Sequence, residues 1–455
     1  MTRVQSLESR QRTHFEGSNF KPARLEELVG MPTVREELAR LIRLLRNYKR
    51  YRSSLPAGVL FFGEPGMGKT LASRILATET GAKFVDATNF PLQQGSWSPT
   101  DLNSLFSLAK KHHSRTGKLV LLHFEELSPL CETKDDRQRA ATQAALLSNL
   151  EGVSGRLQGV FVVACTNNLR SIPEALIRPG RLRVVEFSID REGKKEVLRY
   201  YLSKEGVKEE RLVRSLPPSL TPAAIEQMVK DAVARAGQEG RRPTLADFVQ
   251  SLYRLVLGPP DESWETEEER WITCIHEAGH VSVSRELGAE VKLVAVPKRG
   301  YRKGITLVDW GEKRFRVETQ EKAICNLLAG KQAEEMFGFR SWDEPEDIGL
   351  ATSLSLERFS EHEPHTNYMY DKLLLEMDDF NPGFAPLRVP EAERALIYRR
   401  ARELRERCME RARRILEGAG KDCIERLARM IHEREFLLGD EIEEFFKKAR
   451  RLRSG

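Results

Sequence analysis

One stretch near the N-terminus constrains the fold of this chain more than any other. Residues 58–62 are a short apolar run, Gly-Val-Leu-Phe-Phe, and they lead directly into Gly-Glu-Pro-Gly-Met-Gly-Lys-Thr over residues 63–70. Leu71, Ile75 and Leu76 then follow at helical spacing. A strand, a loop of the form G-x-x-x-x-G-K-[ST] and a helix, in this order, predict a phosphate-binding loop in an α/β fold.

The chemistry of this loop follows from its residue types. Its glycines let the backbone wrap an anion, so that N–H groups and the start of the following helix face the phosphates. Lys69 can reach the β and γ phosphates, and Thr70 offers its hydroxyl to Mg²⁺. This half of the chain is therefore predicted to bind a nucleoside triphosphate.

Polar residues follow two further apolar runs of strand length. The run 118–124 ends in Glu125 and Glu126, a pair that suits one carboxylate for the Mg²⁺ water shell and one for polarising the attacking water. The run 159–165 ends in Thr166 and Asn167. A polar side chain at that strand end can hydrogen-bond the same water or the γ-phosphate.

Two arginines occur on a short turn, Arg178-Pro-Gly-Arg181. By themselves they are most simply surface charges. Arginines on a rigid turn can also stabilise the charge of phosphoryl transfer from a neighbouring subunit. The residues alone leave both interpretations open.

A second motif, His-Glu-Ala-Gly-His at residues 276–280, indicates metal chemistry. On a helix His276 and His280 lie one turn apart, so both imidazoles can reach one cation, while Glu277 points beside it. Thr266 as N-cap, followed by acidic residues, supports a helix here. Zinc held by two histidines needs a third protein ligand and a water whose proton Glu277 can take. The alternative is a chance match on an amphipathic helix.

Composition limits the class of protein. A chain of 455 residues with 40% hydrophobic and 31% charged residues has room for two or three domain cores. No apolar run approaches a membrane span, and the N-terminus lacks a secretory signal, so we expect a cytoplasmic protein. The six cysteines form no Cys-x-x-Cys pair, and a net charge of +6 does not imply nucleic acid.

Together these motifs resemble a known family. The order of phosphate loop, paired carboxylates, Thr-Asn and Arg-Pro-Gly-Arg is similar to that of AAA+ ATPases. The downstream His-Glu-Ala-Gly-His makes the chain resemble the FtsH family of ATP-dependent zinc metalloproteases from about Leu25 to Phe446. The resemblance implies an α/β P-loop AAA+ domain with a parallel sheet between helices, a small helical lid and a mainly α-helical zinc metallopeptidase domain. It also implies homohexameric rings.

The resemblance assigns roles to individual residues. Catalytic roles fall on Glu277, Glu126 and the arginine-finger candidates Arg178 and Arg181. The zinc ligands are His276, His280 and Asp347. Taken alone, Asp347 would be read as a solvated carboxylate at the start of a helix. It matches the position at which the family's third zinc ligand, an aspartate, begins a helix. The residues assigned to the binding of ATP and Mg²⁺ are Gly63, Glu64, Pro65, Gly66, Met67, Gly68, Lys69, Thr70, Leu71, Glu125 and Asn167.

Four segments are expected along the chain. Residues 1–20 are a flexible lead-in, 21–190 the nucleotide-binding domain, 191–258 the helical lid and 259–455 the peptidase domain. Apolar spacing predicts lid helices over 196–202, from about 221, and over 244–257. In the last segment, 291–297 and 304–308 are predicted strands whose edge suits an extended peptide, and 318–337 is a predicted helix.

The C-terminal tail is rich in arginine. The arginines of residues 399–414 lie over an apolar stripe and are interleaved with glutamates, which favours a solvated helix face over a nucleic-acid surface. The closing residues 447–453 suit an acidic partner or a frayed end, and the sequence does not decide between them.

Three departures from the family pattern bear on function. Glu125 stands where the family has Asp, so ATP turnover is expected to be slow or altered. In the substrate-gripping loop the expected aromatic position is Gln94, which leaves Trp97 as the nearest aromatic residue. The family's membrane spans are absent, and the sequence leaves open whether a partner recruits the chain to a membrane. A smaller change, in addition to these three, follows the second arginine, where Leu-Arg-Val replaces Phe-Asp-Arg.

The sequence therefore predicts an ATP-dependent zinc endopeptidase that moves polypeptides through a ring and cleaves them. One alternative is a non-proteolytic remodeller or scaffold, in which the peptidase half serves for docking. Another is a peptidase of unfolded chains for which ATP is a structural ligand.

Overall fold

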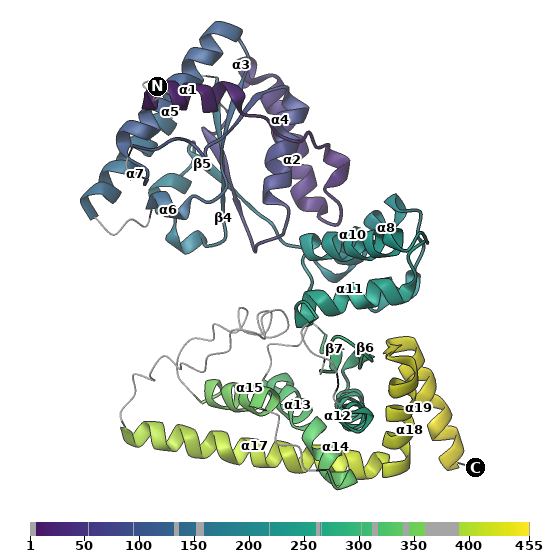
Figure 1. The fold of residues 1–455 in the computed structure, drawn as a ribbon. Coiled ribbons are helices and arrows are strands. Elements are labelled where there is room, and N and C mark those ends of the chain that lie inside the picture. Colours follow the sequence, from purple (N-terminus) through teal and green to yellow (C-terminus); the bar gives the residue numbers. More distant parts are fainter. Residues whose placement is uncertain are drawn as a thin grey trace, which may run out of the picture. The chain divides into compact units, whose positions relative to one another are not determined.

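The computed structural model describes residues 6–454 apart from 53, 94, 132–135, 152–158, 218, 261–263, 265, 302, 312–316, 340–344 and 360–390. The chain divides into two compact units (Figure 1). The first unit comprises Met1–Tyr200 with Thr221–Glu226, and the second comprises Tyr201–Leu220 with Gln227–Gly455. The domain boundaries expected near residues 190 and 258 stay predictions.

A five-stranded parallel sheet organises the first unit. Its order is β2-β3-β4-β1-β5, and all neighbouring strands run in the same direction. The carboxyl ends of all five strands therefore meet at one edge, where the residues that follow β1, β3 and β4 come close together. The strands are β1 (Gly58–Phe62), β2 (Lys83–Asp86), β3 (Val120–Phe124), β4 (Val160–Thr166) and β5 (Leu182–Glu186).

Helices cover both faces of this sheet (Figure 1). Because side chains alternate along a strand, Leu121 and Val163 face one core, whereas Leu122 and Val162 face the other. The first core is closed by α2 (Pro32–Arg46) and α4 (Lys69–Thr80), the second by α5 (Pro99–Thr116) and α7 (Asp136–Glu151). The AAA-type α/β architecture expected from the sequence is confirmed. Short helices complete the unit: η1 (Leu25–Glu27), α3 (Tyr48–Tyr51), α6 (Ser128–Cys131), η2 (Leu169–Ser171) and η3 (Glu174–Ile177).

The N-terminal segment is more ordered than expected. Residues 7–17 form helix α1 (Leu7–Gly17) in place of part of the flexible lead-in proposed for residues 1–20. Phe15 is buried in the core beside α5, and the buried Gln11 amide donates to the carbonyl of Pro91 at 2.9 Å. The pattern was missed because only these two side chains of the helix are buried.

Residues 191–258 are helical, as predicted. They form α8 (Arg191–Lys204), α9 (Glu210–Arg214), α10 (Pro222–Gln238) and α11 (Leu245–Leu257), of which the five-residue α9 was not anticipated. Helix α11 starts with a capping box, in which Thr244 and Asp247 satisfy each other's backbone N–H groups.

Helix α12 (Glu267–Glu286) is the centre of the second unit. It starts at the predicted N-cap Thr266, and twelve of its residues are buried. It packs against α13 (Val317–Leu327), α14 (Ala329–Phe337), α17 (Glu391–Ala419) and α18 (Lys421–Arg434). This helix carries both histidines, and its burial holds them in a fixed place. Helices α15 (Pro345–Glu357) and α19 (Gly439–Ser454) complete the described helices of this unit.

A small antiparallel sheet lies beside α12 in the order β7-β6-β8. The predicted pair, β6 (Glu290–Ala295) and β7 (Ile305–Asp309), is confirmed. The third strand, β8 (Phe436–Leu438), comes from the C-terminal region and pairs with the other side of β6. Three residues carry too little alternation to be recognised in the sequence.

One long predicted helix is broken. The stretch 318–337 forms two helices, α13 and α14, which separate at Leu328. The break leaves the carbonyl of Asn326 in the last turn of α13, where a helix cannot satisfy it from within.

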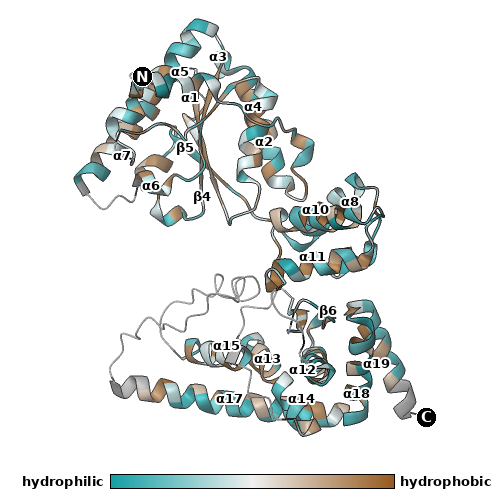
Figure 2. Cartoon of the chain, viewed as in Figure 1, coloured by the Kyte–Doolittle hydropathy of each residue, from teal (hydrophilic) through white to brown (hydrophobic). Residues whose placement is uncertain are grey.

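The apolar stripe of the C-terminal helix α17 is confirmed. Ile397, Ala401 and Leu404 are buried, while hydrophilic residues cover much of the remaining surface of the helix (Figure 2). Several of its arginines form ion pairs along the helix, such as Arg402 with Glu406 at 2.9 Å. None of the described helices combines the length and the apolar character that crossing a membrane requires.

Candidate metal centre and nucleotide site

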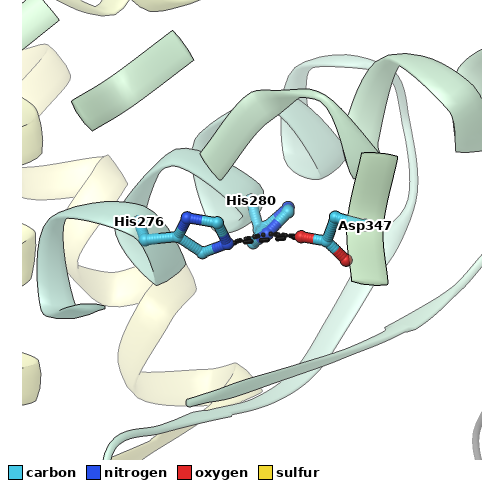
Figure 3. Close-up of side chains that lie close together, drawn as sticks. All are labelled: His276, His280 and Asp347. Carbon is cyan, nitrogen blue, oxygen red and sulfur yellow. Dashed lines mark hydrogen bonds and ion pairs between the residues drawn. The ribbon is translucent and has the colours of Figure 1, made fainter. Parts of the chain in front are cut away.

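Three side chains of metal-ligand type meet in the second unit (Figure 3). The Nε2 atoms of His276 and His280 on α12 lie 2.8 Å apart. Oδ2 of Asp347, in the first turn of α15, lies 3.3 Å from the first of these atoms and 3.0 Å from the second. The structure thus brings together the three residues that the sequence predicted as metal ligands, two of them 71 positions apart.

This donor set fits zinc. Two imidazole nitrogens and one carboxylate oxygen, all mutually close, can occupy three positions around one cation and leave a fourth for water. The carboxylate ligand is also held in the ionised form that metal binding requires. Burial by itself raises the pKa of the Asp347 carboxyl, but the two imidazoles outweigh it and hold that pKa well below its usual range. Burial lowers the pKa of His280, and the Asp347 carboxylate outweighs this effect and raises it.

Each histidine ring is oriented by a contact on its other nitrogen. Nδ1 of His276 lies 2.8 Å from Oε1 of the buried Glu334 on α14. Nδ1 of His280 lies 2.7 Å from the carbonyl of Asn326, the group exposed by the break at Leu328. Such contacts fix the tautomer and direct the opposite nitrogen to a metal. Sequence reasoning gave neither residue a role, although both lie in the stretch 318–337 that it predicted as a helix.

Two glycines allow the close approach of α14 to the metal helix. A Cβ at Gly279 would lie 2.6 Å from Cβ of Ala333, and one at Gly330 would overlap the ring of His276. Small residues are therefore required where these helices cross.

Glu277 lies beside the metal ligands, enclosed by β7. Its side chain is only 5% exposed. Oε2 accepts a hydrogen bond from the Thr306 hydroxyl at 2.5 Å, and the backbone at Gly304 closes over the same carboxyl group. Burial raises the pKa of Glu277, an effect opposed by the two nearby imidazoles and by Thr306. A carboxyl group in this position can exchange a proton with a water at the metal.

In the first unit, residues 63–68 form the turn between β1 and α4, and Lys69, Thr70 and Leu71 open α4. Gly66 and Gly68 have φ angles of 78° and 90°, which favour glycine. Nζ of Lys69 donates to the carbonyls of Gly63 and Glu64 at 2.6 and 2.8 Å, and to Oδ1 of Asn167 at 2.6 Å. Burial lowers the pKa of Lys69. The phosphate loop and the predicted sensor Asn167 therefore share one lysine.

The paired carboxylates after β3 have different partners. One oxygen of Glu125 accepts from the Thr70 hydroxyl, and the other lies 2.8 Å from Nε2 of His123. Glu126 accepts from the backbone N–H and hydroxyl of Ser128 and from the N–H of Asn167. The hydroxyl of Thr70 and the carboxylate of Glu125 are side by side, and oxygen donors of this kind suit Mg²⁺ and its water shell.

Comparison with known proteins agrees with this pairing of sites. Residues 59–189 match the family described as "ATPase family associated with various cellular activities (AAA)". The chain is 27% identical over 448 residues to ATP-dependent zinc metalloprotease FtsH 2 of Symbiobacterium thermophilum, covering 92% of this chain and 74% of that one. The chain is FtsH-like.

Other relatives give the same result. Identity to the ATP-dependent zinc metalloprotease FtsH of Thermus thermophilus is 26% over 447 residues, or 92% of this chain and 69% of the relative. Identity to the ATP-dependent zinc metalloprotease FtsH of Thermotoga maritima is 26% over 369 residues, which covers 75% of this chain and 59% of that relative. The FtsH-like chain thus spans between 59% and 74% of the length of these three relatives. The similarity includes both units.

The nearest aromatic side chain to the candidate gripping position of this FtsH-like chain packs against its own domain. Gln94 lies outside the described residues. Trp97, the nearest aromatic residue, is half-buried, stacks on Phe90 with ring centroids 5.8 Å apart and also contacts Phe124. The indole therefore belongs to the domain core, which does not suit it to grip a passing polypeptide.

The two candidate finger arginines of the FtsH-like chain have different surroundings. Arg181 donates to the carbonyl of Ala175 and to the carboxylate of Glu151 within the domain. Arg178 is 61% exposed and has Glu174 at 3.9 Å, the weaker pairing. Of the two, Arg178 is better placed to reach another molecule.

Proposed function

We propose that this chain is an ATP-dependent zinc endopeptidase. The observation that carries the proposal is the convergence of His276, His280 and Asp347 beside the buried carboxyl group of Glu277, in a chain that also holds an AAA domain. The printed names of the relatives, ATP-dependent zinc metalloproteases, support the same activity at the level of the family.

The chain's own residues suggest how the peptide bond is cleaved. A zinc ion on the three ligands would lower the pKa of water and polarise the peptide carbonyl. Glu277, as carboxylate, takes the proton from the attacking water and returns it to the leaving amine. Thr306 holds one oxygen of Glu277 and leaves the other for this exchange. Glu334 and the Asn326 carbonyl keep the two imidazoles in place.

The ATPase half would drive the movement of polypeptide. Lys69, which now contacts the carbonyls of Gly63 and Glu64, would bind the phosphates of ATP, and Thr70 and Glu125 would hold Mg²⁺. Glu126 polarises the attacking water, Asn167 positions it, and Arg178 acts on the nucleotide of a neighbouring subunit. This last role requires a ring, which we propose to be a homohexamer.

The first experiment is degradation of a permanently unfolded protein in the presence of zinc. It is run with ATP and with a non-hydrolysable analogue, for the unaltered chain and the variants Glu277→Gln and Glu126→Gln. Cleavage that requires ATP turnover and disappears in both variants is the expected result. No cleavage by a chain that binds zinc stoichiometrically and hydrolyses ATP would contradict the protease function.

Specific observations favour two alternative functions. The packed Trp97 and the replacement of Asp by Glu125 favour a remodeller or scaffold, which would cut nothing in this experiment. The same features favour a peptidase of unfolded chains with ATP as a structural ligand. That enzyme would cleave equally with ATP and with the analogue, and Glu126→Gln would not slow it.

A further inference from the structure

His123 lies directly behind the site at the end of β3 and has no part in the mechanism above. It precedes Glu125 by two residues, so both side chains are on the face of the sheet that packs against α4. Its ring is stacked on Phe84 and is 2% exposed. A histidine enclosed in this way is held in one orientation by packing.

The histidine has one described polar contact. Nε2 lies 2.8 Å from Oε2 of Glu125, whereas Nδ1 is buried without a hydrogen-bond partner in the described structure. Leaving a buried ring nitrogen without a partner is costly, and an apolar residue would avoid that cost. The contact with Glu125 is the compensation that the structure shows.

The contact also explains how a glutamate fits where the resemblance leads one to expect an aspartate. The side chain of glutamate is one methylene longer, so its carboxylate would extend past the Thr70 hydroxyl unless it folds back. His123 holds one carboxylate oxygen towards the strand while the other oxygen stays on Thr70.

We propose that His123 is a positioning residue for the Mg²⁺–nucleotide site, and that His123 and Glu125 together replace the shorter carboxylate. The histidine touches neither nucleotide nor metal and acts only through Glu125. The inference rests on the proposed ATP binding. It applies to the first unit and does not depend on peptidase activity.

A double-substitution cycle tests the proposal. The Mg²⁺ concentration that gives half-maximal binding of a fluorescent ATP analogue is measured for the full chain, H123L, E125D and the double variant H123L/E125D. We expect H123L to raise this concentration about tenfold, the size of a lost hydrogen bond to a charged group. In the E125D background, where the shorter carboxylate does not need the histidine, we expect a change below about twofold.

Two further variants separate positioning from packing. H123Q keeps an N–H donor of similar reach and should recover most of the Mg²⁺ response. V163A removes buried volume from the residue paired with His123 on β4, so it should lower Tm and leave the Mg²⁺ midpoint unchanged.

These measurements separate failure of the positioning role of His123 from failure of ATP binding. Equal effects of H123L in both backgrounds, or failure of H123Q to restore the response, would overturn the positioning role while ATP binding stands. Absence of any Mg²⁺-dependent nucleotide binding by the unaltered chain would overturn the ATPase function and this inference with it.

Discussion

The hydroxyl of Thr306 donates to Oε2 of Glu277 at 2.5 Å, and it does so from β7, 29 residues further along the chain. This bond joins the proposed general base to the edge strand of the small sheet. A base that is both buried and held at one oxygen has one direction left in which to exchange a proton.

Replacing Thr306 by valine keeps the shape and removes this donor. We expect kcat for an unstructured peptide to fall about tenfold with little change in KM, because the base loses its orientation while the substrate contacts remain. Thr306→Ser, which keeps the hydroxyl, should retain most activity. Equal losses in both variants would show that the methyl group matters and the hydrogen bond does not.

Glu334 should control zinc affinity. Its contact with Nδ1 of His276 orients the ring, so Glu334→Ala is expected to weaken zinc binding by about 10- to 100-fold, measured by competition with a chelator. The adjacent Glu335 is exposed and contacts Gln332, which makes Glu335→Ala a matched control. If both variants bind zinc like the unaltered chain, the contact has no effect on the metal.

Gly330→Ala should disrupt the candidate zinc site because the added methyl group has no space. The added methyl group overlaps the ring of His276, and relief requires that α14 or the ring move, at a cost of about 1–3 kcal/mol. We expect a lower Tm together with loss of zinc. Gly237→Ala, in the last turn of α10 with open space around it, is the control and should be neutral or slightly stabilising. A Gly330→Ala chain with unchanged Tm and zinc content would contradict the packing described.

Asp247 should give helix α11 an acid-sensitive contribution to stability. Its carboxylate accepts from Arg241 at 2.6 and 2.8 Å and from Thr244, and these bonds, with Arg241 the largest cause, hold its pKa well below the usual range. The folded pKa lies below the unfolded value of roughly 4, so the stabilisation is present above that pH and is lost as pH falls through the folded pKa.

The measurement is the difference in Tm between the unaltered chain and Asp247→Asn from neutral pH downward. This difference should be largest at neutral pH and should narrow below about pH 4. Glu239→Gln removes the exposed partner of the same arginine and should leave Tm nearly unchanged at all pH values. A difference that does not vary with pH would exclude the ionised form of Asp247 as its source.

Much of the fold could be predicted because its signals are local. A strand, a glycine-rich turn and a helix follow one another at residues 58–76, and the cap at Thr266 stands next to the helix it starts. The two histidines are four positions apart in the sequence, and a helix places residues at that spacing on one face. Asp347 was identified only through resemblance, since 71 residues separate it from His276.

The features that were missed depend on contacts between distant segments. Strand β8 exists because β6 offers it an edge, and three residues by themselves carry no recognisable period. The break at Leu328 and the burial of Trp97 are likewise set by packing partners.

The sequence by itself determined which chemistry is present: a phosphate loop, paired carboxylates, and two histidines with a glutamate between them, all defined by spacing within one element. Only the tertiary structure decided which groups orient them. His123, Thr306, Glu334 and the Asn326 carbonyl are ordinary residues in the sequence, and they gain their roles because folding brings their polar atoms within hydrogen-bond reach of a site residue, three of them far along the chain. Local periodicity in the sequence predicts secondary structure, whereas a hydrogen bond depends on where two polar groups meet in the folded chain.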